Sequence, residues 1–277
     1  MTATTIHQAR QLIAESNRIV VLAGAGMSAD IGVGTYWSGA KRQYGEEISR
    51  FGFSQYEHAH GEMWKTHREE QIAFYAETLP LLVKNDVMTV DSPYKILKDY
   101  LQAEDKDSFI LTSNVDAAFV RAGFDTDRVY EVHGNRLRSQ CLQEPFEHGV
   151  FATDINSAKN TPCPTCQSPS RPNCLFFVDF DFNPLVLHQQ QKRFSDYKDS
   201  FLTGKTVILE IGAGTTIAAI RNQGMRLNRD YDIPIIRINL HELNETTGME
   251  NIIRRSIKAP TLGIELNASK GLKTLLW

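Results

Sequence analysis

The sequence predicts an α/β fold in which an open parallel sheet carries helices on both faces and a smaller module is inserted between its strands. Short β-branched strands alternate with helical or loop segments, the pattern of strands joined by crossover helices. The first strand, Arg18–Ala23, is almost entirely apolar, as expected of a strand buried on both faces of a parallel sheet. Two long stretches, 38–90 and 137–202, interrupt the alternation. We therefore expect the chain to leave the sheet and return to it twice.

Each further element of the sheet has its own signal. Apolar residues at helical spacing predict a first helix over Ile6–Ser16. Ser92 and Pro93 suit an N-cap and a first helical position, so a helix is expected over Tyr94–Leu101. The later strands are short, mostly β-branched segments: Ser108–Thr112, Val129–Val132, Thr206–Ile211, Ile233–Leu240 and Leu262–Leu266.

The two interruptions differ in composition. The stretch 38–90 is rich in aromatic residues and mostly helical in pattern, with a helix break expected at Pro80. The stretch 137–202 holds all four cysteines and six of the ten prolines, and its periodicity becomes helical only over Leu185–Tyr197. The expected division is a sheet domain of residues 1–37, 91–136 and 203–277, with the two insertions forming the smaller module.

Composition limits the classes of function. A chain of 277 residues is long enough for one elaborated domain or two small ones. Its net charge of −3 gives no sign of a nucleic acid or an anionic membrane as partner. The longest apolar run, Ile19–Met27, is far short of the roughly 20 residues of a spanning helix. The first eight residues also lack the pattern of a secretory signal, so we expect a cytoplasmic protein without a membrane partner.

The segment VLAGAGMSADIGVGTYW, Val21–Trp37, leads from the first strand into a glycine-rich loop. Gly24-Ala25-Gly26 allows a sharp turn and a close approach of backbone to ligand, and N–H groups at the start of a helix suit a pyrophosphate. Ser28 can donate a further hydrogen bond. The spacing differs from the usual dinucleotide fingerprint, so the glycines alone are also compatible with a plain turn.

Polar side chains follow the ends of the other expected strands, the edge at which open parallel sheets bind ligands. Asn114 and Asp116 follow the second strand, and His133 follows the third. Alternatively, the first two could cap a helix and His133 could be a structural histidine. Gly212, Gly214 and Thr215 follow a fourth strand and Asn239 a fifth, where an amide or hydroxyl could hold a ribose or an adenine edge, or simply finish a turn.

Taken together, these motifs resemble those of the sirtuins. In chain order, the matching residues are Gly24-Ala25-Gly26-Met27-Ser28 with Gly32 and Tyr36, then Ser113-Asn114-Val115-Asp116, His133-Gly134, Cys163-Pro164-x-Cys166, Arg171-Pro172-Asn173, Gly212 with Thr215 and Thr216, and Ile238-Asn239-Leu240. The matches cover nearly the whole chain in the family's order.

The resemblance implies a Rossmann-like NAD domain with a small module made of a helical insertion and a zinc ribbon. It implies that Asn114 and Asp116 lie at the nicotinamide pocket and that Asn239 lies near the adenosine ribose. The remaining implied NAD-binding residues are Gly24, Ala25, Gly26, Ser28, Tyr36, Ser113, Gly212 and Thr215. Its catalytic histidine corresponds to His133, which would act as a base. The catalytic part of Asn114 and Asp116 would be to twist and shield the nicotinamide.

The activity implied is cleavage of the bond between nicotinamide and ribose with transfer of the ADP-ribosyl group. His133 and Arg171-Pro172-Asn173 favour a protein-lysine deacylase. Two departures favour a protein mono-ADP-ribosyltransferase, or an NAD hydrolase, similar to the macrodomain-linked branch. Residues 34–37 replace Pro-Asp-Phe-Arg, and 177–179 replace Phe-Gly-Glu. The expected partner is thus an acylated or ADP-ribosylated protein. A non-catalytic NAD sensor stays open, whereas a dehydrogenase is disfavoured because no hydride-transfer constellation supports it.

The cysteines point to a structural metal site or its remnant, because clustered cysteines in a reducing compartment are typical of zinc sites. Cys163 and Cys166 form one pair, and Cys141 begins a second, with Glu144 or His148 as the fourth ligand. The alternative is a loop held by packing with free thiols. Cys174 is expected to be part of a strand in the core.

Overall fold

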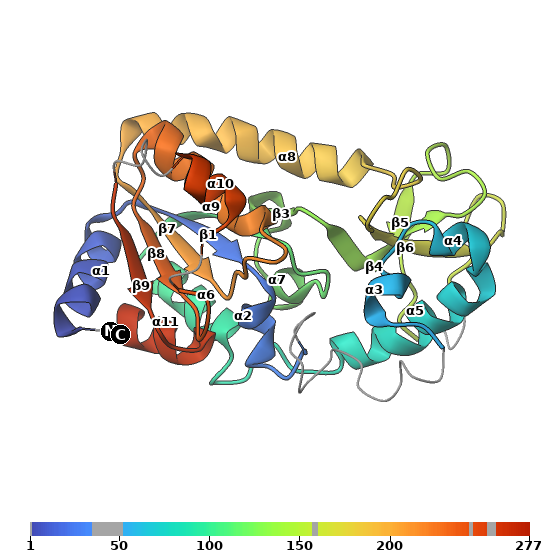
Figure 1. The fold of residues 1–277 in the computed structure, drawn as a ribbon, viewed down its shortest axis with the longest axis horizontal. Helices are drawn as coiled ribbons and strands as arrows, with labels where there is room; N and C mark the ends of the chain where they lie inside the picture. The colour runs from blue at the N-terminus through green and yellow to red at the C-terminus, as the bar shows by residue number, and fades with distance from the viewer. Residues whose placement is uncertain (1, 35–51, 157–159, 244–245, 254–258) are drawn as a thin grey trace.

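The computed structural model describes residues 2–34, 52–156, 160–243, 246–253 and 259–277, and it divides into a larger α/β part and a smaller module (Figure 1). The large sheet has six parallel strands in the order β3-β2-β1-β7-β8-β9. They are Arg18–Ala23 (β1), Asp107–Thr112 (β2), Val129–Glu131 (β3), Thr206–Ile211 (β7), Ile235–Ile238 (β8) and Thr261–Ile264 (β9). The predicted fold class and all six predicted strands are confirmed.

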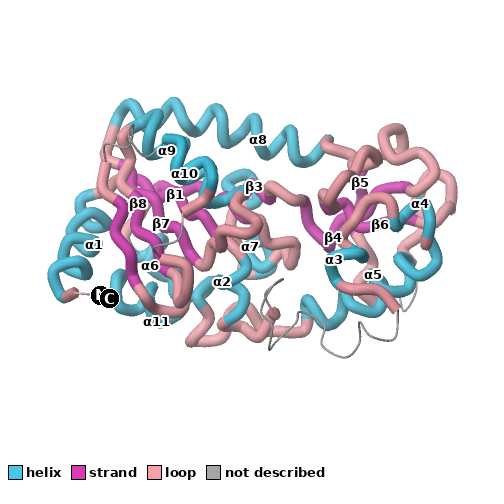
Figure 2. Tube along the Cα trace, in the orientation of Figure 1, coloured by secondary structure: helices cyan, strands magenta, loops and turns pink. Residues whose placement is uncertain are grey.

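Helices cover both faces of this sheet (Figure 2). One core contains side chains of α1 (Ala3–Glu15), α6 (Pro93–Ala103) and α11 (Ala268–Leu276), and the other contains side chains of α8 (Leu185–Lys198) and α9 (Ala219–Tyr231). β1 shows how one strand serves both: Val21 packs in the first core and Val20 in the second, because successive side chains point to opposite faces. The Ser92 hydroxyl caps α6 by accepting a hydrogen bond from the N–H of Tyr94, as predicted.

Short elements complete the larger part. They are α2 (Ala25–Ala29), α7 (Ala118–Arg121), α10 (Gly248–Ile253) and the 3₁₀ turns η2 (Thr126–Arg128) and η3 (Asp199–Thr203). In register, Ala23 of β1 lies opposite Thr112 of β2 and Ile211 of β7. The carboxyl ends of these strands therefore form one edge, where α2 begins.

The smaller module combines an antiparallel sheet with short helices. Its strands are β4 (Gly134–Cys141), β5 (Val150–Ala152) and β6 (Ser170–Cys174), in the order β5-β4-β6, and its helices are α3 (Gln55–His58), α4 (Met63–Thr66) and α5 (Arg68–Val83). The predicted break at Pro80 is wrong, since α5 continues through it. Burial of Leu79 and Leu82 on either side offsets the roughly 3 kcal/mol that an internal proline costs a helix.

The helix α8 runs from the smaller module back over the large sheet (Figure 1). The ring of Phe194 on α8 packs 5.1 Å from that of Phe109 on β2. The domain boundaries given above stay a prediction, although they place this helix within the second insertion. Among the described residues, every helix is too short or too polar to cross a lipid bilayer.

Candidate active site and metal centre

The glycine loops after β1 and β7 touch each other at the carboxyl edge of the sheet. The N–H of Gly24 donates to the carbonyl of Ile211 (2.9 Å), and that of Gly26 donates to the carbonyl of Gly212 (3.0 Å). Gly212 has a φ of +61°, and a Cβ there would lie 2.4 Å from the Met27 nitrogen. A Cβ on Gly26 would lie 2.7 Å from the Cα of Gly212. Only glycine allows this contact.

The contact between the loops explains the need for glycine in the predicted pyrophosphate loop without any ligand. The N–H groups of Gly24 and Gly26 are already paired within the protein, so the two glycines would serve a ligand by having no side chain rather than by donating to it. The absence of side chains at the two glycines fits a group that needs close backbone approach, such as a dinucleotide. Their assignment to NAD, with Ala25, remains a prediction.

Four buried polar side chains from three elements meet below these loops. Ser28 Oγ donates to Asp116 Oδ2 (2.5 Å), and Asn114 Nδ2 donates to Ser28 Oγ (3.0 Å) and to the Gly24 carbonyl (3.1 Å). Because the Ser28 proton is directed at Asp116, the Tyr94 hydroxyl donates to Ser28 Oγ (2.7 Å). The structure therefore brings together three predicted site residues. The fourth, Tyr94 on α6, gave no functional signal in the sequence.

Burial sets the ionisation of this network. It raises the pKa of Asp116, against the effect of hydrogen bonds from Ser28 and the Ala118 N–H. It also raises the pKa of Tyr94 well above its usual value, and the nearby carboxylate of Asp116 adds to the effect. Ser28, Asp116 and Tyr94 are 2%, 3% and 0% exposed, whereas Asn114 is 9% exposed. Asn114 is therefore the member best placed to reach a ligand.

His133 lies between β3 and β4, where the chain passes from the large sheet to the small one. Its imidazole forms a hydrogen bond with the backbone of Ser113, the residue before Asn114. Burial lowers the pKa of His133, and the bond to Ser113 partly opposes this. The following Gly134 has a φ of +74°, and a Cβ there would lie 2.1 Å from the Asn173 carbonyl oxygen. The glycine thus fixes the turn that holds His133 beside Asn114.

Thr215 and Asn239 follow β7 and β8. Thr215 is hydrogen-bonded to Glu242, a residue that the sequence analysis did not single out. Glu242 accepts hydrogen bonds from the N–H of Thr215 (2.7 Å) and from its hydroxyl (3.3 Å). Asn239 Nδ2 donates to the carbonyl of Ala213 (3.0 Å). The two loops that carry Thr215 and Asn239 are therefore tied together. Glu242 stands three positions after Asn239, and this closeness was its only signal.

Behind these loops lies a buried network of two arginines and two glutamates. Arg237 pairs with Glu210 (2.5 Å) and with Glu250 (2.7 Å), while Arg221 lies 3.6 Å from Glu210. Arg221 also donates to the carbonyls of Ala213 and Glu242. The network thus holds both loops from the inside. A buried ion pair needs such further hydrogen bonds to offset its desolvation.

The candidate metal centre consists of Cys141, His148, Cys163 and Cys166, whose ligand atoms all lie within 4.8 Å of one another. Cys141 Sγ lies 3.6 Å from Cys166 Sγ, and Cys163 Sγ lies 3.5 Å from His148 Nδ1. Tetrahedral zinc with bonds of about 2.0–2.3 Å places its ligand atoms about 3.3–3.8 Å apart, so the group fits zinc. His148, not Glu144, approaches the three cysteines. Glu144 instead donates its backbone N–H to Cys141 Sγ (3.4 Å).

Hydrogen bonds around the sulfurs also suit metal binding. Bonds from the Ser168 side chain and backbone lower the pKa of Cys166 to about 6, which favours the thiolate that zinc requires. Cys174 differs: it lies in β6 and is 3% exposed, and burial raises its pKa to about 12. Cys174 is therefore part of the core, as predicted.

The structure also shows the surroundings of one departure from the sirtuin pattern. Asp179 accepts two hydrogen bonds from the guanidinium of Arg171 (2.5 and 3.0 Å), and both side chains are 1% exposed. Val178 has a φ of +50°, a conformation that a β-branched residue rarely adopts. The backbone thus keeps a glycine-like shape at the position where the family pattern has glycine.

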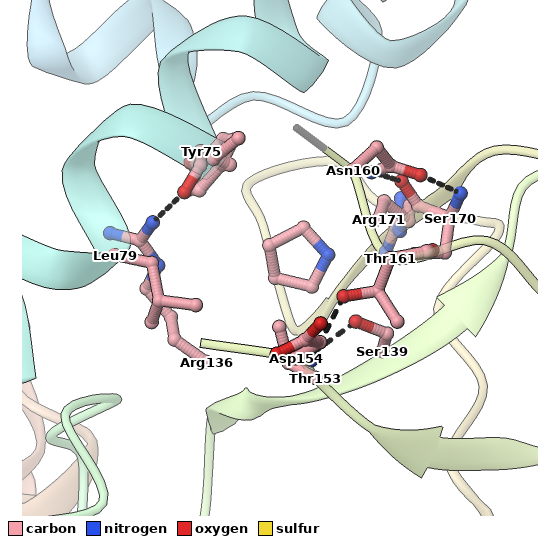
Figure 3. Close-up of a pocket in the computed structure, with 12 residues that line it drawn as sticks. Tyr75, Leu79, Arg136, Ser139, Thr153, Asp154, Asn160, Thr161, Ser170 and Arg171 are labelled. Carbon is pink, nitrogen blue, oxygen red and sulfur yellow. Dashed lines mark hydrogen bonds between the residues drawn. The ribbon is translucent and has the colours of Figure 1, made fainter. Parts of the chain in front are cut away.

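A pocket in the smaller module lies apart from this edge. Its volume is about 30 Å³, room for a few water molecules. Figure 3 shows its polar lining: Ser139 faces Thr153, and Asn160 is paired with Ser170. It is too small for a dinucleotide. The predicted site residue Tyr36 and the departure at positions 35–37 lie outside the described residues.

Comparison with known proteins identifies the family. Residues 24–196 match the Sir2 family. An NAD-dependent protein deacylase 2 of Archaeoglobus fulgidus is 29% identical over 169 residues, which are 59% of this chain and 60% of that protein. A protein ADP-ribosyltransferase of Staphylococcus aureus is 26% identical over 238 residues, covering 79% of this chain and 73% of that protein.

Solved structures share the fold. The structure of a Sir2 homologue in complex with NAD matches with a TM-score of 0.69 and 19% identity, covering 98% of this chain and 92% of that chain. A Sir2 protein bound to a propionylated peptide matches with a TM-score of 0.65 and 17% identity, covering 98% and 97%. Since the family match spans more than half of its residues, the chain belongs to the Sir2 family.

Proposed function

We propose that this chain cleaves the bond between nicotinamide and ribose of NAD and transfers the ADP-ribosyl group, acting as a protein-lysine deacylase. One observation carries the proposal: the imidazole of His133 is bonded to the Ser113 backbone, next to Asn114 and Asp116 and beside the touching glycine loops. A base, a carboxamide and a close-approach backbone therefore share one edge of the sheet. The deacylase relative from Archaeoglobus fulgidus supports this assignment.

The residues suggest a division of work. NAD would supply a cationic nicotinamide leaving group and the ADP-ribosyl group. Asn114 would orient the nicotinamide end, and Asp116 would hold Asn114 in place through Ser28. His133 would accept a proton from a ribose hydroxyl at the ring nitrogen that is not bonded to Ser113. Because burial lowers its pKa, the imidazole is neutral near pH 7, as a base must be.

We further propose that the second substrate is a protein with an acylated lysine, and that Cys141, His148, Cys163 and Cys166 hold a structural zinc. The propionylated peptide bound to a structural relative supports the first point. The spacing of the four ligand atoms supports the second. The zinc would stabilise the connection between β4 and β6 and take no part in the reaction, because its ligands lie at the end of β4 and in the loops that follow, within the smaller module.

The test is a deacylation assay on the purified full chain with NAD and an acetylated or propionylated lysine peptide, read by mass spectrometry. We expect peptide deacylation that depends on NAD, and a loss of at least about 100-fold in the His133→Ala variant. The matched control is His188→Ala, which changes an exposed histidine on α8. Absence of NAD-dependent deacylation by the folded wild-type protein would contradict the proposal.

Protein mono-ADP-ribosylation is the second candidate. The similarity to the Staphylococcus aureus enzyme spans 79% of this chain, and the exposed side chain of Val178, where the family pattern has glycine, favours a different acceptor. NAD labelled in its phosphate separates the two activities. Label that becomes covalently attached to protein, whether or not acylated peptide is present, would favour this candidate over the deacylase.

A further inference from the structure

Two residues before His133, a buried carboxylate joins three parts of the molecule. Glu131 ends β3 and is 1% exposed. Its Oε1 accepts a hydrogen bond from Asn135 Nδ2 (2.6 Å). Its Oε2 accepts bonds from Arg138 Nη1 (2.6 Å) and Gln190 Nε2 (3.3 Å). We call these four residues the Glu131 clasp; none of them belongs to the site described above.

The bond from Asn135 closes the turn that contains His133. Glu131 and Asn135 stand on either side of His133-Gly134, so their side chains bridge the turn directly. The amide of Asn135 has a fixed orientation, because its Oδ1 accepts a short bond from the N–H of Leu137 (2.6 Å). Its Nδ2 must therefore face Glu131.

The rest of the turn is held by backbone bonds. The N–H of Val132 donates to the carbonyl of Thr112 on β2 (2.9 Å). The carbonyl of His133 accepts from the N–H of Leu175, just after β6 (2.9 Å). The backbone is thus bonded on both sides. Among the hydrogen bonds described for Glu131 and Asn135, the one between their side chains is the link that crosses the turn. A shift of the turn would have to break it.

The other two members connect the turn to separate elements. Arg138 lies on β4 of the small sheet, and its side chain is 23% exposed. Gln190 lies on α8 and also accepts from the N–H of Glu131 through its Oε1 (3.0 Å). One carboxylate therefore links β3, β4 and α8 at the junction of the two sheets.

We propose that Glu131 is a positioning residue for His133: by closing the turn with Asn135, it holds the imidazole beside Ser113 and Asn114. This inference rests on the proposed role of His133 as the base. Displacement of a catalytic group by about 1 Å can cost about 100-fold in rate. The clasp restrains the turn with charge-assisted bonds, which are stronger than neutral ones.

An exchange of hydrogen-bonding groups tests the proposal. In Glu131→Gln, the amide N–H₂ must face a donor, either Asn135 or the pair Arg138 and Gln190, so at least one bond is lost. In Asn135→Asp, two carboxylates face each other. The double variant restores every bond: the amide introduced at position 131 donates to the carboxylate at position 135, and its oxygen still accepts from Arg138 and Gln190. Glu104→Gln, an exposed change at the end of α6, is the control.

Three readouts are needed: kcat on the acylated peptide, KM for NAD, and the imidazole NMR signals of His133. We expect each single variant to lose about 10- to 100-fold in kcat, with little change in KM for NAD, and to shift the His133 signals. The double variant should recover most of the kcat and the wild-type signals. A folded double variant no better than the single ones, or single variants with unchanged kcat and signals, would overturn the proposal.

The test remains decisive if a variant does not fold or if the wild-type protein has no deacylase activity. If a single variant does not fold, Asn135→Ala provides the measurement, because it removes the bond across the turn and leaves Glu131 bonded to Arg138 and Gln190; unchanged kcat and unchanged His133 signals in this variant would count against the clasp. If the wild-type protein has no activity, the proposed function fails. The His133 signals of the exchange series still decide whether Glu131 positions the ring.

Discussion

Ser28 on α2 donates a 2.5 Å hydrogen bond to the buried carboxylate of Asp116, in the loop after β2. The two residues are 88 positions apart in the sequence, yet this bond joins the glycine loop to the loop that carries Asn114. Since both side chains are buried, the bond fixes the base of the candidate site rather than offering Ser28 to a ligand. Ser28, predicted to line the pyrophosphate, thus has a supporting position in this structure.

Loss of the Ser28 hydroxyl should destabilise the protein. Ser28→Ala removes a donor to a buried carboxylate and leaves Asn114 and Tyr94 without their shared partner. We expect the free energy of unfolding to fall by about 1–3 kcal/mol, as measured by urea denaturation. Ser195→Ala, at an exposed position on α8, should change it by less than about 0.5 kcal/mol. Equal stabilities of the two variants would refute this role.

The contact between the glycine loops predicts a sharp difference between two glycines. Gly212→Ala places a Cβ 2.4 Å from the Met27 nitrogen and must separate the loops. Gly52 has a similar φ of +73° but no atom within 4 Å of an added Cβ. By calorimetric titration, Gly212→Ala should weaken NAD binding by about tenfold or more, since about 1.4 kcal/mol of distortion suffices. Equal NAD affinity in Gly212→Ala and Gly52→Ala would show that the loops do not shape the site.

The pH dependence of the reaction follows from His133. Burial lowers its pKa, so the base form persists at pH values below the ordinary pKa of about 6.5. We expect kcat/KM for the acylated peptide to fall only when the pH drops below about 6.5, as His133 becomes protonated. Initial rates over a series of buffers at constant ionic strength would measure this. An acid limb that lies above this value would mean that another group titrates.

The metal centre makes a prediction for each candidate ligand. Cys141→Ser, Cys163→Ser, Cys166→Ser and His148→Ala should each lower the zinc content from about one ion per chain, as measured by mass spectrometry of the purified protein. Cys174→Ala and Glu144→Gln should keep the metal, because neither side chain belongs to the cluster. Zinc loss in Glu144→Gln with retention in His148→Ala would reverse the assignment of the fourth ligand.

The sheet was predictable because its signals are local. β1 and β7 consist mostly of buried apolar residues, and their bounds agree with the prediction at both ends. Ile233–Leu240 was predicted too long, since the structure limits β8 to Ile235–Ile238. The break predicted at Pro80 was wrong because the sequence shows only the local cost of a proline to a helix. The burial of Leu79 and Leu82, which offsets this cost, depends on tertiary packing.

The candidate site was only partly predictable for the same reason. Gly24, Asn114 and His133 stand directly at strand ends, which a sequence pattern can mark. Tyr94 reaches the site from a crossover helix, and Glu131, the last residue of a strand, bridges the turn that contains His133, so their contacts exist only in three dimensions. The choice between Glu144 and His148 also depended on the path of the chain after Cys141, which spacing alone did not fix.

The buried arginines and glutamates behind the β7 and β8 loops are out of reach of dissolved ions. Salt screens charges that face water, with a Debye length of about 8 Å at physiological ionic strength. The side chains of Lys192 and Asp196 on α8 are more than 60% exposed, so salt will weaken their attraction. Those of Arg221 and Glu210 are 0% exposed. The hydrogen bond from Arg221 to the Ala213 carbonyl should therefore persist when salt is added, and the loops that carry Thr215 and Asn239 should keep their arrangement at low and at high ionic strength.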